Sequence, residues 1–260
     1  AGEPMLRVVP PQDGPPEYWA IGRLPGASLT EGRFEVVHLD ALGVGWKRLL
    51  DEHGRALRYL TRAAGDRQLA PLRTTVVWLA GPTEDGAPVG VAGHRTLLLS
   101  AARSGDRLLH AELALAWLLR EQLLRSMPPR VPAWARESLA QYYAVRALRR
   151  TELPADAVAA AERRLIEPLR PLQLREAQRQ AQTGDARALA ELRSVGAAFW
   201  DRIDRAIVRK SGFRTIDSML PRLLAADWPE GRLPPSAVER LHEYASAGTI
   251  DELLAQHVGD

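Results

Sequence analysis

The chain has 260 residues, of which 46% are hydrophobic and 26% charged, and its formal net charge is +3. This composition supports a substantial core and argues against a disordered chain. The absence of cysteine excludes disulfide bonds, thiolate zinc ligands and cysteine nucleophiles. Arginines alternate with acids, only 6% of residues are aromatic, and no segment approaches the roughly 20 apolar residues of a membrane span. We therefore expect neither nucleic-acid binding nor a membrane-spanning helix.

The chain divides into three regions. Residues 1–30 are rich in proline and glycine, which favours an extended arm lying on the body. Residues 31–150 combine β-branched runs with helical spacing of apolar residues, and residues 151–260 show helical spacing throughout. The predicted elements of the middle region are strands at 34–39, 73–79 and 95–100 and helices at 46–63, 106–124 and 132–149. The sequence thus predicts an α+β, mostly helical fold, with a small β-layer packed on the last two of these helices and a helical C-terminal half.

Two segments in the middle region carry a recognisable pattern. Residues 108–119 read LLHAELALAWLL, and residues 131–143 read VPAWARESLAQYY. Together they resemble the gluzincin, or peptidase MA-like, zinc metallopeptidases. In that family a helix with H-E-x-x-H supplies two zinc-binding histidines and a glutamate base. The next helix has the pattern P-x-W-x-x-E-G-x-A-x-Y-Y and supplies a third ligand. The residues that match this second pattern are Pro132, Trp134, Glu137, Ala140, Tyr142 and Tyr143.

The resemblance also shows what the chain lacks. Aligning A-E-L-A-L with H-E-x-x-H puts Ala111 and Leu115 at the histidine positions and Glu112 at the position of the base. Neither hydrocarbon side chain can donate a lone pair to zinc, so Glu137 is the one ligand candidate left. His110 does not restore the motif, because one residue turns a helix by about 100°. We expect no bound metal and no other cofactor.

Arg193 provides a hypothesis for the vestigial carboxylates. Residues 195–200 resemble the helix that follows the active site in the family, and Arg193 stands where relatives often carry a tyrosine. A buried unpaired carboxylate is costly, so we expect Arg193, or Arg136 as the second candidate, to replace zinc as the positive charge between Glu112 and Glu137. In the alternative interpretation Glu112 is solvated, and the helix dipole stabilises Glu137.

The resemblance implies a catalytically inactive bacterial peptidase homologue that is exported to the periplasm or secreted. Its former active-site cleft would bind a peptide or protein partner, with Trp134, Tyr142 and Tyr143 as cleft-lining or core aromatics. An active hydrolase, with non-standard metal ligands or with carboxylate chemistry from Glu112 and Glu137, is the alternative. A structural component of a larger assembly is the third possibility.

Overall fold

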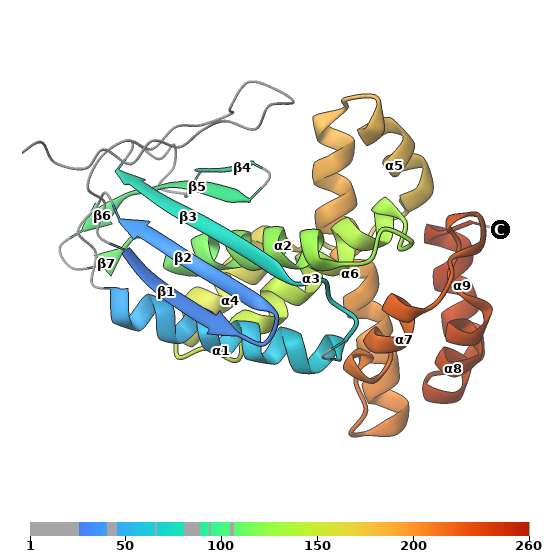
Figure 1. The fold of residues 1–260 in the computed structure, drawn as a ribbon. Coiled ribbons are helices and arrows are strands. Elements are labelled where there is room, and N and C mark those ends of the chain that lie inside the picture. Colours follow the sequence, from blue (N-terminus) through green and yellow to red (C-terminus); the bar gives the residue numbers. More distant parts are fainter. Residues whose placement is uncertain are drawn as a thin grey trace, which may run out of the picture.

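A five-stranded sheet forms one layer of the molecule (Figure 1). The computed structural model describes residues 26–40, 46–65, 67–80, 89–93, 95–104 and 107–259. The strand order is β1-β2-β3-β5-β4. The strands are β1 (Gly26–Glu31), β2 (Phe34–Asp40), β3 (Leu72–Ala80), β4 (Val89–Ala92) and β5 (Thr96–Ala101), and β6 (Arg103–Ser104) pairs separately with β7 (Arg107–Leu108).

The three central strands are the predicted ones, and the two edge strands were not predicted. Strands β2, β3 and β5 run parallel, and β1 and β4 are antiparallel edges. Helix α1 (Trp46–Ala64) is the crossover that the parallel pair β2–β3 requires. Residues 26–30 of the expected arm lie in β1, which pairs with β2 through a turn at Gly32 (φ 56°). Residues 1–25 lie outside the described residues.

Helices α1 and α2 (Ala111–Ser126) cover one face of the sheet, and α3 (Ala133–Leu148) packs against α2 (Figure 1). The side chains that the sheet turns toward these helices are almost fully buried; they include Val36, Val76, Trp78, Leu97 and Leu99. Burying such apolar surface supplies most of the stabilisation of a domain of this kind. The predicted β-layer is therefore present, but it packs on α1 and on the first motif helix α2, whereas the second motif helix α3 packs on α2. The fold is α+β and mostly helical.

Helix α2 begins later than the sequence pattern predicted. Residues 107 and 108 belong to β7, and His110 has a left-handed backbone (φ 54°), which cannot continue into a helix. The helix therefore begins at Ala111. It ends at Ser126, just before the pair Pro128 and Pro129, since proline excludes the helical conformation of the residue before it.

The second half is helical, as predicted. It comprises α4 (Ala155–Leu165), α5 (Leu174–Gln182), α6 (Ala186–Ser211), α7 (Leu220–Ala225), α8 (Pro235–Tyr244) and α9 (Ala247–His257), with short turns of 3-10 helix at Ile216–Ser218 and Pro229–Gly231. Asp185 caps α6 by accepting from the backbone N–H groups of Arg187 and Ala188. None of the helices in the described ranges is both long and apolar enough to cross a membrane.

Helices α3 and α6 approach closely because of one glycine. A Cβ atom at Gly196 would lie only 2.6 Å from the Cβ of Ser138. The Ser138 hydroxyl donates to the Trp134 carbonyl at 2.6 Å and accepts from the Trp200 indole at 2.8 Å. Buried residues of both halves join one hydrophobic cluster across this contact. This contact fixes how α3 and α6 lie relative to each other, and with them the side chains that the two helices turn toward one another.

Candidate functional site

An ion pair joins the motif glutamate to the second half of the chain. The Arg193 Nε on α6 donates to the Glu137 Oε2 on α3 at 2.8 Å. The two side chains are 25% and 17% exposed, so water screens the pair less than it screens a surface pair. This is the contact that the sequence hypothesis expected of its first-choice arginine. Glu137 is therefore a carboxylate whose charge is already balanced within the protein.

Arg120 of α2 extends the ion pair into a cluster. Its Nη2 donates to Glu121 Oε1 at 2.9 Å, and its Nη1 lies 3.5 Å from Gln141 Oε1. Burial lowers the pKa of Arg120, and the positive charge of Arg193 lowers it further, whereas Glu121 and Glu137 act in the opposite direction. We call these five residues the arginine–carboxylate cluster. Sequence reasoning missed Arg120, although a charge directly after the uncharged run of residues 113–119 is a signal that could have marked it as a candidate.

Glu112 is not part of this cluster. Its Oε1 lies 3.6 Å from His110 Nδ1 at the start of α2. Within the described ranges, no hydrogen bond or ion pair joins Glu112 to Glu137, Arg136 or Arg193. The proposed bridge between two carboxylates is thus present only on the Glu137 side.

The two positions aligned with zinc-binding histidines lie on another side of α2 from the cluster. Leu115 is fully buried in the core, and Ala111 is the first residue of the helix. At about 100° per residue, Ala111 and Leu115 leave the helix within about 40° of each other, and Arg120 leaves it about 180° from Ala111. Arg136, the second candidate arginine, has a buried Nε with no hydrogen-bond partner in the described part of the chain.

The motif tyrosines lie in the core. Tyr142 is 3% exposed, and its hydroxyl donates to Asp204 Oδ2 at 2.9 Å. The Arg146 Nη1 donates to the same Tyr142 hydroxyl at 2.8 Å and forms an ion pair with Asp204. Tyr143 is fully buried, and its hydroxyl has no partner among the described residues. Both rings therefore stabilise the contact of α3 with its neighbours.

A small hollow opens beside the arginine–carboxylate cluster, and we call it the α2 hollow. Its volume is about 120 Å³, and its walls come from α2, α3 and the end of α4. The lining residues are Leu113, Ala116, Trp117, Arg120, Gln141, Arg164 and Leu165. Strand β4 lies against the Trp117 ring, since a Cβ at Gly90 would be 2.4 Å from it. The hollow thus combines apolar walls with two arginines.

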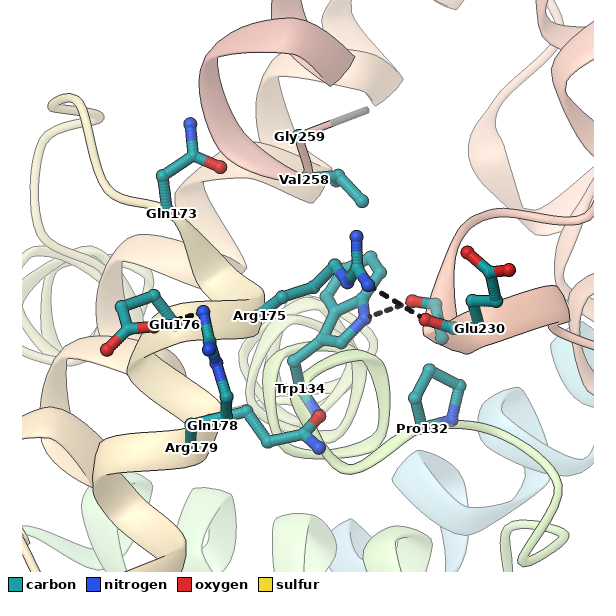
Figure 2. A pocket seen from close by; sticks show the side chains of 11 residues that line it. Pro132, Trp134, Gln173, Arg175, Glu176, Gln178, Arg179, Glu230, Val258 and Gly259 are labelled. Atoms are coloured by element: carbon teal, nitrogen blue, oxygen red, sulfur yellow. Dashed lines mark hydrogen bonds and ion pairs between the residues drawn. The ribbon is translucent and has the colours of Figure 1, made fainter.

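A larger pocket of about 490 Å³ lies at the N-terminal end of α3. Figure 2 shows Arg175 and the Trp134 indole pointing toward the turn that carries Glu230. Arg175 Nη2 donates to the Glu230 carbonyl at 3.0 Å, and the Trp134 indole N–H donates to the Gly231 carbonyl at 2.8 Å. The Trp134 backbone N–H donates to Gln178 Oε1 at 2.8 Å. These side chains hold α5 and the turn to the start of α3, so Trp134 serves as a packing residue.

The residues present do not fit the zinc ion of the gluzincins. The aligned positions carry hydrocarbon side chains, and Arg193 engages the remaining carboxylate. Across the ranges that the structure describes, no group of three or more His, Cys, Asp and Glu side chains could hold a metal ion. Any zinc chemistry would need ligands other than those of the family motif.

Comparison with known proteins supports the fold. No protein-family model matches the sequence, and no curated protein is similar to it. Among solved structures, an aminopeptidase N family protein from Idiomarina loihiensis is similar with a TM-score of 0.56 at 11% identity, over 92% of this chain and 45% of that chain. An M1 zinc metallopeptidase from Deinococcus radiodurans is similar with a TM-score of 0.52 at 17% identity, over 92% of this chain and 53% of that chain.

A variant of the Deinococcus radiodurans peptidase with a Tyr-Ser-Ala substrate bound is similar with a TM-score of 0.50 at 17% identity, over 92% of this chain and 52% of that chain. The chain thus spans about half the length of the solved structures that it matches. These likenesses define the class: the fold of this chain is gluzincin-like. The resemblance that the two motif segments indicated is confirmed at the level of the fold.

Proposed function

We propose that this protein is a non-catalytic homologue of gluzincin metallopeptidases that binds a peptide or a protein segment at the surface formed by the two motif helices. The pairing of Glu137 with Arg193 at 2.8 Å carries the proposal. A zinc ion at Glu137 would have to displace the arginine, and leaving that arginine partly buried without its partner is costly. Ala111 and Leu115 offer no compensating metal bonds.

A peptide is the expected ligand class because the fold relatives are peptidases, one of them solved with a tripeptide substrate. The α2 hollow next to the cluster has a volume of about 120 Å³, below the roughly 300–1,000 Å³ of a pocket for a whole small-molecule ligand, and so it could take one side chain of a peptide. Binding in this hollow needs no metal, because its lining consists of apolar and polar side chains and two arginines. Export to a periplasm or secretion is also part of the proposal, and fractionation of the source cells tests it.

The first claim of the proposal is that the protein is not catalytic. We test it by measuring the zinc content of the purified, untagged protein and then titrating the protein with zinc in a calorimeter. We expect no stoichiometric zinc and no hydrolysis of aminopeptidase substrates, with the fold unchanged in chelator. About one tightly bound zinc per chain, with chelator-sensitive hydrolysis, would instead establish a hydrolase with non-standard ligands.

The second claim of the proposal is that the protein binds peptides. We test it by probing an array of short peptides of varied sequence with the labelled protein. We expect a subset of peptides to bind with sequence preference. Binding should persist in chelator, because the proposed contacts need no metal. A blank array that includes free N-terminal, free C-terminal and internal sequences would exclude peptide binding.

A further inference from the structure

Arg120 in the α2 hollow is only partly satisfied by its protein partners. Its Nε and Nη2 both donate to Glu121 Oε1, at 3.3 and 2.9 Å. Its Nη1 reaches only Gln141 Oε1, at 3.5 Å, which is the limit of a hydrogen bond. Because a guanidinium carries five N–H donors in a planar fork, Arg120 retains donor capacity toward the hollow that it lines.

Positive charge exceeds negative charge around the hollow. Arg120 and Arg164 line it, and Arg193 is close enough to lower the pKa of Arg120. Glu121 pairs with Arg120, and Glu137 pairs with Arg193. Arg164 is exposed and makes no hydrogen bond or ion pair with the part of the chain that the structure describes. The hollow therefore favours an anionic group, which would meet a second, free arginine at its rim.

The remaining walls of the hollow are apolar. Leu113, Ala116, Trp117 and Leu165 contribute hydrocarbon and aromatic surface, and the volume is about 120 Å³. That space is smaller than the roughly 300–1,000 Å³ of a pocket for a whole small-molecule ligand, so it has room for no more than a single side chain. A ligand that satisfies both parts of the lining carries a carboxylate directly beside an apolar side chain. In a polypeptide, these two groups occur on one residue only at the C-terminus.

We infer that the α2 hollow binds the C-terminal residue of a peptide, with its carboxylate between Arg120 and Arg164 and its apolar side chain against Leu113, Trp117 and Leu165. This inference rests on the proposed peptide-binding function. The bidentate geometry of arginine with a carboxylate provides orientation as well as affinity. Gln141 holds the lining in place, since its Oε1 lies 3.5 Å from Arg120 Nη1 and its Nε2 donates to the Leu165 carbonyl at 3.2 Å.

The test uses N-acetylleucine, a minimal C-terminal residue, and N-acetylleucinamide, which differs only in the carboxylate. Binding is followed by the indole N–H signal of Trp117 in ¹H–¹⁵N spectra, assigned with Trp117→Phe. We expect millimolar binding of the acid and binding of the amide weaker by about tenfold or more. The variant Arg164→Ala should weaken binding of the acid by a similar factor. Because Arg164 is exposed, this replacement should leave the fold intact.

Arg163→Ala is the matched control, because Arg163 is the exposed neighbour of Arg164 on α4 and does not line the hollow. It should leave the affinity for N-acetylleucine unchanged. Equal binding of acid and amide, equal effects of the two arginine variants, or no binding up to roughly 20 mM acid would each overturn the inference. If internal sequences bind on the peptide array in these cases, the proposed function survives; if the array is also blank, both fail.

Discussion

His38 and His53 form a fully buried imidazole pair, with His38 Nε2 lying 3.1 Å from His53 Nδ1. The Trp78 indole donates to His38 Nδ1 at 2.9 Å, and His53 Nε2 lies 2.8 Å from Gln122 Oε1. Since an indole N–H can only donate, His38 must carry its proton on Nε2 and pass a hydrogen bond to His53. His53 then donates to Gln122. The chain of hydrogen bonds links β3 and β2 to α1 and α2, and it requires both rings to be neutral.

The stability of the fold should therefore fall in mild acid. Burial lowers the pKa of His38 to about 2 and that of His53 to about 4, from an unfolded value of about 6.5. The unfolded chain then binds more protons than the folded chain below pH 6.5. The contribution of the neutral pair to stability is complete above about pH 6.5 and is lost as the pH falls toward the folded pKa values, with a slope of up to about 2.7 kcal/mol per pH unit.

Urea unfolding at a series of pH values from about 7.5 to about 4.5 measures this slope. His242 provides the control, because it lies on the surface beside Asp251. The variant His242→Gln should keep most of the acid sensitivity between pH 6.5 and 5, a range above the usual titration of carboxylates. The double variant His38→Gln/His53→Gln should lose most of it. An unchanged slope in that double variant would contradict the prediction.

The partly buried pair of Arg193 and Glu137 should show measurable coupling. A double-mutant cycle with Arg193→Ala and Glu137→Gln isolates the pairwise contribution to the free energy of unfolding. We expect about 1–2 kcal/mol, since the side chains are 25% and 17% exposed. The cycle for Arg179 and Glu176, which are 74% and 45% exposed, should give about 0.5 kcal/mol or less. Equal coupling in the two cycles would mean that burial does not strengthen the motif pair.

Several elements of the fold were predictable because their signals are local. The β-branched run at 73–79 gave β3, the spacing of leucines gave α1, and the helical pattern of residues 132–149 gave α3. The edge strands were missed for physical reasons: β4 has four residues that include Gly90, and β1 is stabilised by pairing with β2 more than by its own composition. Their existence depends on tertiary contacts.

The candidate site was predictable only in part. By analogy with the family, the glycine at 196 indicated that Arg193 lies near Glu137. The structure contains this contact between Arg193 and Glu137. The partners of Arg120 were not predictable, because they depend on which face of α2 turns toward α3. The aligned motif put Ala111 and Leu115 first, whereas the helix turns Arg120 toward the motif glutamate.

The close approach of α3 and α6 should depend on Gly196. Replacing it with alanine would place a Cβ 2.6 Å from Ser138 Cβ, which we expect to cost about 1–3 kcal/mol of unfolding free energy. Gly248→Ala is the control, because that glycine in α9 has nothing within 4 Å of an added Cβ. Gly248→Ala should leave the free energy of unfolding unchanged or raise it by up to about 1 kcal/mol, because alanine has a higher helix propensity than glycine. A Gly196→Ala variant as stable as Gly248→Ala would show that the helices can move apart freely.

Restoring histidines tests where a metal could bind on α2. The variant Ala111→His/Leu115→His follows the motif alignment, but it puts an imidazole at the fully buried Leu115, at a cost of about 2–5 kcal/mol. The variant Ala116→His/Arg120→His also places two histidines one turn apart, in the α2 hollow on the side of Gln141 and Glu137. We expect the second variant to bind zinc more tightly than the first, and most tightly when Arg193→Ala frees Glu137.

Calorimetric titration with zinc compares the two pairs of histidines. Each is measured with and without Arg193→Ala, and thermal unfolding confirms that each variant is folded. Tighter zinc binding by the 116/120 variant, increased by removal of Arg193 and abolished by Glu137→Gln, would show that the vestigial ligand faces the hollow. Tighter binding by the 111/115 variant would instead show that α2 can turn its motif positions toward Glu137, and the aligned register would then describe the metal site from which this chain has diverged.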